Sequence, residues 1–587
     1  DGITLRLGVL SDTQYGRGGL GITDHSRKQF RNAMAALKNR IGGSWDNLDV
    51  LMMPGDISHN TYWNGSNQEL DLFFQDLKEC LGDSKLKVLF LRGNHDAKNE
   101  AEIAQDPMNN GNFVKAVRQY YDPDYVADFI EDVNGYQFVM VSQDTRRGND
   151  DPSDYADIHS EKTVEWFGKA IAQAEEKSAG KPVFVGMHPN TYDPEVSGGK
   201  PDVNSGTVFG SFPIDGFINQ SAARLSYWAT GSLYSAMKPY DNIITFSGHS
   251  HWTTANERSI HQRDFTSINT GAVNNMEIEN AWDEPYQPKR FGSNENESNS
   301  YYITVNTDQK VNIERLDLYR MNRDNNVDAR LGEDWVVDIA AGKAGFTYTE
   351  NRDTEDPVFA EGAAVTVQDI TATSAELIWD NRKVLDDTGV NNYWIEIVNK
   401  ETNATEKIYT PSAYYWLPGD EMPEKNNQTA KGLSAETAYE VRVYAMDQFY
   451  KKTAVPITAE FTTPAREVLP APLIDVSFTD ADNGIRDHSN YARVYDMDPL
   501  VTGKTEMTWD DTYHMYVANF AAASGTSASP NFFKVLLDDG RRSLMQESGG
   551  YTIDLLFKPE ALNAGIDAET AVIGAAQTNG FDILYTK

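Results

Sequence analysis

Cysteine, positive charge and long apolar runs are all scarce in this chain of 587 residues. The one cysteine, Cys80, excludes an intramolecular disulfide framework and a cysteine-rich zinc site. No run of about 18 apolar residues occurs, so we expect no membrane span. Only 52 Lys and Arg stand against 88 Asp and Glu, a formal net charge of -36. Because basic residues drive nucleic-acid binding, we do not expect duplex nucleic acid as a partner.

The length indicates several domains, and the composition is that of ordinary globular protein. Domains cluster near 100–200 residues, so we expect roughly three. A chain that is 40% hydrophobic, 24% charged and 11% aromatic is neither globally disordered nor a collagen or coiled coil. The chain enters an apolar run soon after Asp1 and shows no signal peptide. We therefore expect either a cytosolic protein or a mature or trimmed form of an exported one.

Short apolar runs alternate with amphipathic stretches in the first half of the chain. The runs predict buried strands, and the stretches between them predict helices, which together indicate an α/β domain. The expected strands lie near residues 4–10, 50–53, 88–91, 138–141, 183–185 and 243–246, and the clearest helices at 26–40 and 70–81.

Polar side chains follow five of these strands. Ligands of an open α/β sheet bind beyond the carboxyl ends of its strands. Carboxylate, amide and imidazole groups are ligands for hard or borderline divalent metals. A single Asp after a strand is more often a helix cap, but five polar strand ends in one domain favour a metal site. The residues are Asp12, Gln14, Asp56, Asn94, His95, Asp96, His188, His249 and His251.

These motifs, in this order, resemble the calcineurin-like metallophosphoesterase superfamily over residues of about 3–320. The resemblance is carried by Asp12-Thr13-Gln14, Gly55-Asp56, Gly93-Asn94-His95-Asp96, His188 after a strand, and Gly248-His249-Ser250-His251. It implies a four-layer α/β/β/α sandwich and a dinuclear centre of Mn, Zn, Fe or Mg. The implied reaction is attack of a metal-bound hydroxide on a phosphate ester.

The resemblance also assigns roles to the residues. Asp56 would bridge the two metals. One metal would be completed by Asp12, Gln14 and His251, and the other by Asn94, His188 and His249. His95 would stabilise the transition state or protonate the leaving group, with Asp96 orienting its ring. The family usually has His at the position of Gln14, whose amide could bind directly, bind through water, or leave the position open.

The substrate is less well defined than the reaction. We expect substrate contacts from Tyr15, His59, Asn60 and Trp252, and a substrate-facing lid between residues 190 and 234. No Arg cluster is evident that would hold a phosphomonoester dianion, so a phosphodiester is favoured. The alternatives are a phosphomonoesterase or nucleotidase, and a non-catalytic surface binding protein. A nuclease is disfavoured by the acidic charge.

From about residue 357 the sequence pattern changes to strands of alternating apolar and polar residues, separated by turn residues. This pattern predicts a β-sandwich of about 100 residues. Trp379, the Leu433 to Tyr439 corner and the exit at 461–464 resemble a fibronectin type III domain. The rest resembles a concanavalin-like (laminin-G-like) jelly roll, although it is shorter than that fold usually needs and is either truncated or another sandwich.

These boundaries give three expected domains: 1–356, with a polar connector from about 320, then 357–464 and 465–587. By analogy, such modules favour a secreted or cell-surface location and a glycan or cell-surface ligand.

Overall fold

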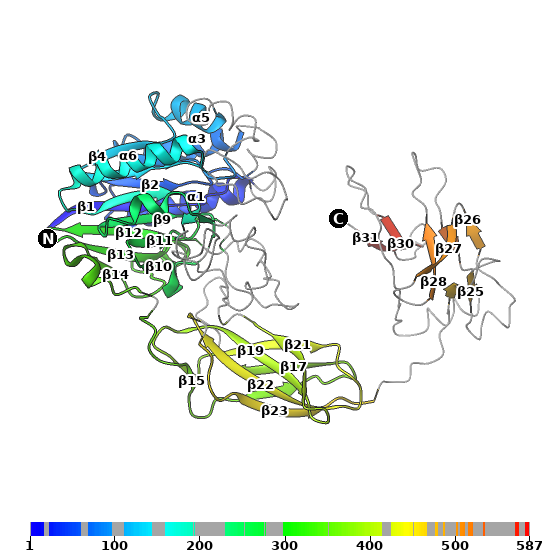
Figure 1. The fold of residues 1–587 in the computed structure, drawn as a ribbon. Coiled ribbons are helices and arrows are strands. Elements are labelled where there is room, and N and C mark those ends of the chain that lie inside the picture. The colour runs from blue at the N-terminus through cyan, green and yellow to red at the C-terminus, as the bar shows by residue number, and fades with distance from the viewer. Residues whose placement is uncertain are drawn as a thin grey trace. The chain divides into compact units, whose positions relative to one another are not determined.

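The computed structural model divides the chain into two compact units, Asp1–Arg466 and Glu467–Lys587 (Figure 1). The described residues are 2–16, 23–59, 68–96, 111–143, 159–191, 193, 229–251, 253–274, 276, 298–349, 351–411, 413, 424–449 and 451–465, followed by the short strands of the second unit. Among the helices of these ranges, none combines the length and the apolar character that a membrane crossing requires.

The first unit contains a six-stranded mixed sheet. Across the sheet its strands are β14 (Trp335–Asp338), β13 (Lys310–Asp317), β12 (Asn299–Asn306), β1 (Ile3–Val9), β2 (Val50–Pro54) and β3 (Lys87–Leu91). Strands β1, β2 and β3 are parallel, while β12, β13 and β14 pair in antiparallel fashion. The carboxyl ends of β1, β2 and β3 therefore meet at one edge, where the polar strand-end motifs begin.

A second six-stranded sheet also mixes parallel and antiparallel strands. Its order is β10 (Ile260–Gln262), β11 (Thr266–Asn269), β9 (Ile243–Ser247), β6 (Val183–Met187), β5 (Tyr136–Met140) and β4 (Phe129–Val133). Strands β5, β6, β9 and β11 are parallel, and β4 and β10 close the edges in antiparallel fashion. All six strands expected from the apolar runs are confirmed, as β1, β2, β3, β5, β6 and β9.

The two sheets share one hydrophobic core. Leu7 of the first sheet belongs to the same buried cluster as Phe138 and Phe184 of the second. Along β2, Met52 faces this shared core and Met53 faces the helices outside, because successive strand side chains point to opposite faces. Burial on both faces explains why these strands are apolar at nearly every position.

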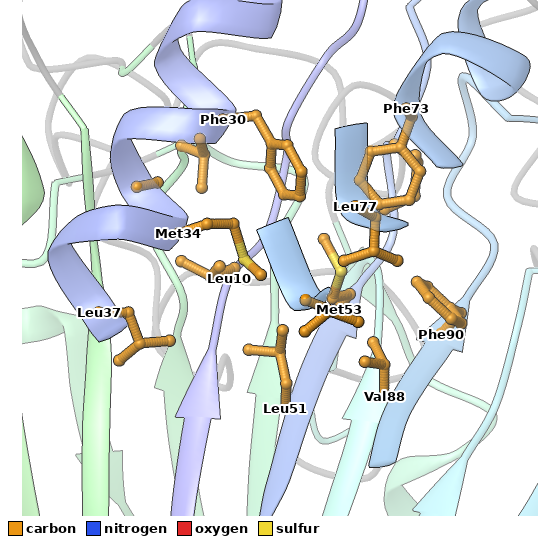
Figure 2. Packing of buried hydrophobic residues seen from close by; sticks show 14 of the residues in the cluster. Leu10, Phe30, Met34, Leu37, Leu51, Met53, Phe73, Leu77, Val88 and Phe90 are labelled. Atoms are coloured by element: carbon orange, nitrogen blue, oxygen red, sulfur yellow. The ribbon is translucent and has the colours of Figure 1, made fainter. Parts of the chain in front are cut away.

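Helices cover the two outer faces. Helices α1 (Thr23–Arg40), α3 (Gln68–Leu81) and α5 (Asn112–Tyr120) share a buried cluster with the first sheet, and α6 (Glu161–Ser178) and α9 (Tyr234–Met237) with the second. Figure 2 shows Phe30 and Met34 of α1 and Phe73 of α3 packed over Leu51 and Met53 of β2. Each such buried side chain contributes roughly 1.5–3 kcal/mol. Helices, sheet, sheet and helices form the four layers expected for this part of the chain.

The remaining elements of this region are short. They are η2 (Trp45–Asn47), β7 (Asn190–Thr191), β8 (Ala229–Thr230), η3 (Glu257–Ser259), α10 (Leu318–Arg323) and η4 (Ile339–Gly345).

The stretch after residue 320 is more ordered than expected. The prediction of a polar connector over the whole of 320–356 was wrong, because β14 joins the first sheet. Trp335 is 2% exposed, its ring lies 4.4 Å from the Arg315 guanidinium, and its Nε1 donates to Glu257 Oε2 at 3.0 Å. Val337 is also 2% exposed, and both side chains belong to the core that the two sheets share. Burial of these two side chains favours a short edge strand within a polar sequence.

Two smaller antiparallel sheets follow. One contains β16 (Val365–Gln368), β17 (Ser374–Asp380) and β21 (Lys425–Lys431), and the other β20 (Ala404–Tyr409), β19 (Val390–Asn399), β22 (Ala438–Asp447) and β23 (Ile457–Thr462). A separate pair joins β15 (Val358–Phe359) to β18 (Val384–Leu385). Trp379 of the three-stranded sheet belongs to the same buried cluster as Tyr393 and Tyr439 of the four-stranded sheet. The β-rich character is confirmed, and the fibronectin type III assignment stays a prediction.

The second unit is also built of strands. Those described are β24 (Val476–Phe478), β25 (Ile485–Asp487), β26 (Leu500–Thr502), β27 (Thr505–Asp510), β28 (Met515–Phe520), β29 (Phe532–Lys534), β30 (Thr570–Gly574) and β31 (Asp582–Tyr585). The jelly-roll assignment stays a prediction.

Candidate metal centre

The loops that follow β1 and β2 hold each other in place. The backbone N–H of Asp12 donates to the carbonyl of Gly55 at 3.2 Å, and that of Gln14 donates to the carbonyl of Asp56 at 3.0 Å. These bonds continue the pairing of the two parallel strands beyond the sheet. They bring the side chains of Asp12, Gln14 and Asp56 into one region.

Left-handed backbone is concentrated in the loops after β1, β2 and β9. Five of the candidate ligands are non-glycine residues with positive φ: Asp12 (52°), Gln14 (47°), Asp56 (51°), His249 (68°) and His251 (53°). Such a conformation costs a residue with a Cβ about 1–2 kcal/mol. Strain of this kind persists where the surrounding structure fixes it, and it gathers at functional sites.

One candidate group contains Asp56, His188 and His249, whose ligand atoms all lie within 4.8 Å of one another. Nε2 of His188 lies 3.1 Å from Asp56 Oδ2 and 3.1 Å from Asn94 Oδ1. Nδ1 of His188 lies 2.8 Å from the carbonyl oxygen of Pro54. Since a carbonyl only accepts, Nδ1 carries the proton and Nε2 is available as a ligand, the arrangement common around metal-binding histidines.

The second group contains Asp12, Asp56 and His251, again with ligand atoms within 4.8 Å of one another. Nε2 of His251 lies 3.1 Å from Asp12 Oδ1, and the hydroxyl of Ser11 lies 2.5 Å from Asp12 Oδ2. The backbone N–H of His249 also donates to the Asp12 carboxylate, at 3.2 Å. Asp56 is thus common to both groups.

The carboxylates of this centre are removed from water. Asp12 is 0% exposed and Asp56 is 1% exposed. Burial alone raises the pKa of Asp56, but the neighbouring His188 and His95 outweigh it and hold that pKa well below its usual range. Burial likewise lowers the pKa of His188, and the charge of Asp56 outweighs it, so the net shift is upward. Two buried carboxylates with imidazole and amide groups around them fit a borderline divalent cation.

Two glycines make the close approach of the loops possible. A Cβ at Gly93 would overlap the backbone N and Oδ1 of Asp56. A Cβ at Gly248 would overlap Oδ2 of Asp12 and Oγ of Ser11. The glycines of the Gly-Asn-His and Gly-His-Ser-His motifs are therefore required by space, because no other residue lacks the Cβ.

Gln14 presents its two amide atoms to different neighbours. Its Nε2 lies 3.0 Å from Asp56 Oδ2 and 3.2 Å from His251 Nε2. Its Oε1 lies 2.6 Å from Nδ1 of His59. The donor side of the amide therefore faces the carboxylate, and the carbonyl faces His59. Direct ligation by the Gln14 carbonyl would require the amide to turn over.

His95 lies beside the Asp56 carboxylate, and His59 lies beside His95. The backbone N–H of His95 donates to Asp56 Oδ1 at 2.9 Å, and its Nδ1 donates to the carbonyl of His59 at 2.9 Å. The two imidazole rings stack with centroids 4.8 Å apart and planes 19° apart. The bond from Nδ1 leaves Nε2 of His95 as the atom available to a substrate.

The expected role of Asp96 was wrong. Its carboxylate accepts hydrogen bonds from the backbone N–H groups of Ser58 (2.8 Å), Gly93 (2.9 Å) and Ile57 (3.2 Å). Nδ1 of His95 is held by a backbone carbonyl instead of by a carboxylate. Asp96 ties the loop after β2 to the loop after β3, and burial raises its pKa, with the charge of Asp56 acting in the same direction.

The expected substrate contact of Tyr15 was also wrong. Tyr15 is 0% exposed, its hydroxyl donates to Asp76 Oδ2 at 3.0 Å, and its ring packs edge-on against Phe30 and Phe73. It belongs to the core beneath α1 and α3. Asn60, Trp252 and most of the expected lid (192 and 194–228) lie outside the described residues.

Comparison with known proteins agrees with this geometry. Residues 5–253 match the family model described as "Calcineurin-like phosphoesterase". None of the curated proteins compared with the chain is significantly similar to it.

Similarity to solved structures is low. The purple acid phosphatase PPD1 from yellow lupin (Lupinus luteus) seeds is 12% identical with a TM-score of 0.33, covering 58% of this chain and 56% of that one. A structure of PhoD is 11% identical with a TM-score of 0.31, covering 53% and 65%. The fn3 domain of human collagen alpha-1(XX) chain is 18% identical with a TM-score of 0.14, covering 19% and 90%.

The assignment therefore rests on the family model and on the two Asp and His groups within its range. Residues 5–253 of this chain therefore match a calcineurin-like metallophosphoesterase domain.

Proposed function

We propose that this domain hydrolyses a phosphate ester, specifically a phosphodiester, with two divalent cations at the centre. The observation that carries the proposal is that Asp56 belongs to both buried groups of possible ligands. A carboxylate with two oxygens is suited to bridge two cations. Asp12 and His251 would hold one ion, with Gln14 joining them if its amide turns its carbonyl towards the metal. Asn94, His188 and His249 would hold the other ion.

The chemistry of such a centre is general. Divalent ions held by these residues would supply Lewis acidity, which would offset the negative charge of the phosphate ester and make a hydroxide nucleophile accessible near neutral pH. Binding of the ions also offsets the cost of burying Asp12 and Asp56 together.

His95 is the residue best placed to act on the substrate. Its Nδ1–H is held by the carbonyl of His59, and its backbone N–H is held by Asp56. These two bonds fix the ring, and Nε2 can hydrogen-bond a phosphate oxygen or donate a proton to the leaving group. Positioned acid–base groups of this kind contribute typically about 10²–10⁴-fold to rate. His59, stacked on His95, is the second candidate for a substrate contact.

The charge around the centre favours a diester. Within the described part of the chain, no Arg or Lys side chain hydrogen-bonds to Asp12, Asp56 or Asn94. A phosphomonoester carries more negative charge than a diester, and Arg or Lys groups commonly supply the extra charge-assisted hydrogen bonds. A phosphomonoester or nucleotide is the alternative substrate.

The β-rich regions would serve as accessory domains. Residues 357–464 fit a fibronectin type III-like spacer, since Tyr439 is buried and the backbone N–H of Ser434 lies 3.0 Å from its hydroxyl, as in a tyrosine corner. Residues 465–587 would form a concanavalin-like domain with a glycan or cell-surface ligand. This arrangement would suit a secreted or cell-surface enzyme.

Hydrolysis assays on metal-stripped protein test the proposal. The protein is refilled in turn with Mn, Zn, Mg or Fe and given bis(p-nitrophenyl) phosphate or p-nitrophenyl phosphate. Metal-dependent turnover with higher kcat/KM for the diester supports the whole proposal. A preference for the monoester would overturn the diester assignment alone, and absence of turnover with every metal would overturn the enzymatic one.

A further inference from the structure

A third acidic group lies outside the catalytic centre. It borders the small sandwich, the name used here for the two smaller antiparallel sheets and the β15–β18 pair (residues 358–462). Asp353 precedes β15, Asp386 follows β18, and Asp447 ends β22. Each offers a carboxylate oxygen, and these oxygens all lie within 4.8 Å of one another. The group therefore joins the segment after η4 to two separate parts of the sandwich.

One oxygen of each carboxylate is already engaged. Oδ2 of Asp386 accepts from the backbone N–H groups of Thr388 (2.8 Å) and Gly389 (2.6 Å). Oδ1 of Asp447 accepts from those of Phe449 (2.8 Å) and Lys451 (2.9 Å). Bonds from backbone N–H groups favour the ionised carboxylate and fix its orientation.

The other oxygen of each carboxylate is buried and has no hydrogen-bond partner among the described residues. These atoms are Oδ1 of Asp353, Oδ1 of Asp386 and Oδ2 of Asp447. Asp447 is 0% exposed and Asp353 is 8% exposed. A buried polar atom without a partner is costly, and native proteins usually satisfy it with a protein group, a water or an ion.

The charge of the group matches a divalent cation. Nζ of Lys451 lies 3.2 Å from Oδ2 of Asp353, whereas the oxygen without a partner is Oδ1. Burial raises the pKa of Asp353, and it raises that of Asp447 to about 7, so a bound cation would favour the ionised forms. With all three carboxylates ionised, this single ammonium leaves two negative charges. Oδ1 of Asp356 lies 3.9 Å from the same ammonium and adds a further negative charge near the group.

We propose that Asp353, Asp386 and Asp447 bind a Ca²⁺ ion. All three donors are carboxylate oxygens, without His or Cys, which suits a hard cation. Ca²⁺ accepts irregular oxygen geometry and completes its shell with water or backbone carbonyls, whereas Mg²⁺ demands a near-ideal octahedron. The ion would fasten the segment around Asp353 to the loops of the sandwich. This inference does not depend on the proposed catalytic function.

Thermal unfolding of the full chain, followed during a CaCl₂ titration after EGTA treatment, tests the site. We expect the midpoint to rise by roughly 3–6 °C, with half of the effect at about 10⁻⁴–10⁻³ M Ca²⁺. Asp447→Asn and Asp386→Asn should remove this rise. Without Ca²⁺, Asp447→Asn should unfold at or above the wild-type temperature, because one of three repelling charges is gone.

Two controls separate this site from other effects. Glu361→Gln removes an exposed charge from the same sandwich and should keep the full response to Ca²⁺. Asp56→Asn alters the catalytic centre and should also keep it. The proposal is overturned by a wild-type midpoint that does not move up to about 10 mM Ca²⁺, tenfold above the expected range. The proposal is also overturned if both Asp386→Asn and Asp447→Asn keep the rise in midpoint with Ca²⁺, or if Asp56→Asn loses that rise. An equal rise with Mg²⁺ would overturn the assignment to Ca²⁺.

Discussion

Nδ1 of His59 lies 2.6 Å from Oε1 of Gln14, and this contact sets which side of the Gln14 amide faces the metal centre. An amide oxygen only accepts, so His59 donates from Nδ1. The amide nitrogen is thereby directed at Asp56 Oδ2, 3.0 Å away. The carbonyl of the same His59 accepts from His95. One residue therefore positions both Gln14 and His95.

Replacing Gln14 by His should tighten the metal site that Gln14 borders. An imidazole nitrogen is a better ligand for borderline metals than an amide, and Nε2 of Gln14 already lies beside His251 and Asp56. We expect Gln14→His to slow the loss of one metal ion to EDTA by about tenfold or more, the scale of effects around metal ligands. Equal rates of loss in Gln14→His and the wild type would contradict a ligand position at residue 14.

His95→Ala should separate catalysis from metal binding. The backbone N–H that donates to Asp56 remains in this variant, so the metal content should not change. Loss of the imidazole should lower kcat by about 10²–10⁴-fold. The measurements are steady-state kinetics and metal analysis of the same preparation.

His59→Ala is the matched comparison for His95→Ala. It removes a ring that stacks on His95 but leaves the backbone carbonyl that holds Nδ1 of His95. A smaller fall in kcat, of about tenfold, is expected, because the general acid–base group itself remains. If His59→Ala were as damaging as His95→Ala, the catalytic role would have to be reassigned between them.

Gly248→Ala should empty the centre while the domain stays folded. The added Cβ would overlap the carboxylate of Asp12, so that side chain must move away from His251. We expect loss of metal-dependent turnover with little change in far-UV circular dichroism. Gly168→Ala is the control, since its Cβ would meet nothing within 4 Å and the residue lies inside α6. That change should leave activity intact and stabilise the fold by about 0.5–1 kcal/mol.

Cys80 should react slowly with thiol reagents. Burial raises the pKa of its thiol to about 11. Because the thiolate is the reacting species, its population at pH 8 should be roughly a hundredfold below that of an unperturbed cysteine. Labelling by iodoacetamide should therefore keep accelerating up to about pH 11. A rate that levels off near pH 9 would show that the thiol is not held in this buried environment.

Much of the catalytic half could be predicted because its signals are local. Buried parallel strands are apolar on both faces, so β2 and β6 stand out as continuous apolar runs. The strand ends then follow, and with them Asp56 and His188. Strand β14 was missed because it has only four residues, of which Trp335 and Val337 are buried, and the sequence around it is polar.

The errors within the site have a different cause. Asp96 was assigned by the family resemblance and Tyr15 by its closeness in sequence to Gln14. The partners of Asp96 are backbone groups of another loop, and the partner of Tyr15 is the buried Asp76. Spacing along the chain does not give these partners. The group of Asp353, Asp386 and Asp447 was missed for the same reason, since no local motif connects residues so far apart.

The number of metal ions held by wild type and by Asp56→Asn tests the central claim most directly. Protein stripped and then refilled with Mn or Zn is analysed for bound metal and assayed with the diester, with Asp308→Asn, an exposed carboxylate, as control. If Asp56 bridges two ions, the wild type and Asp308→Asn hold two equivalents, and Asp56→Asn loses at least one together with turnover. A dinuclear centre built on Asp56 would be contradicted if Asp56→Asn retained two ions and full turnover. It would equally be contradicted if the wild type bound no metal.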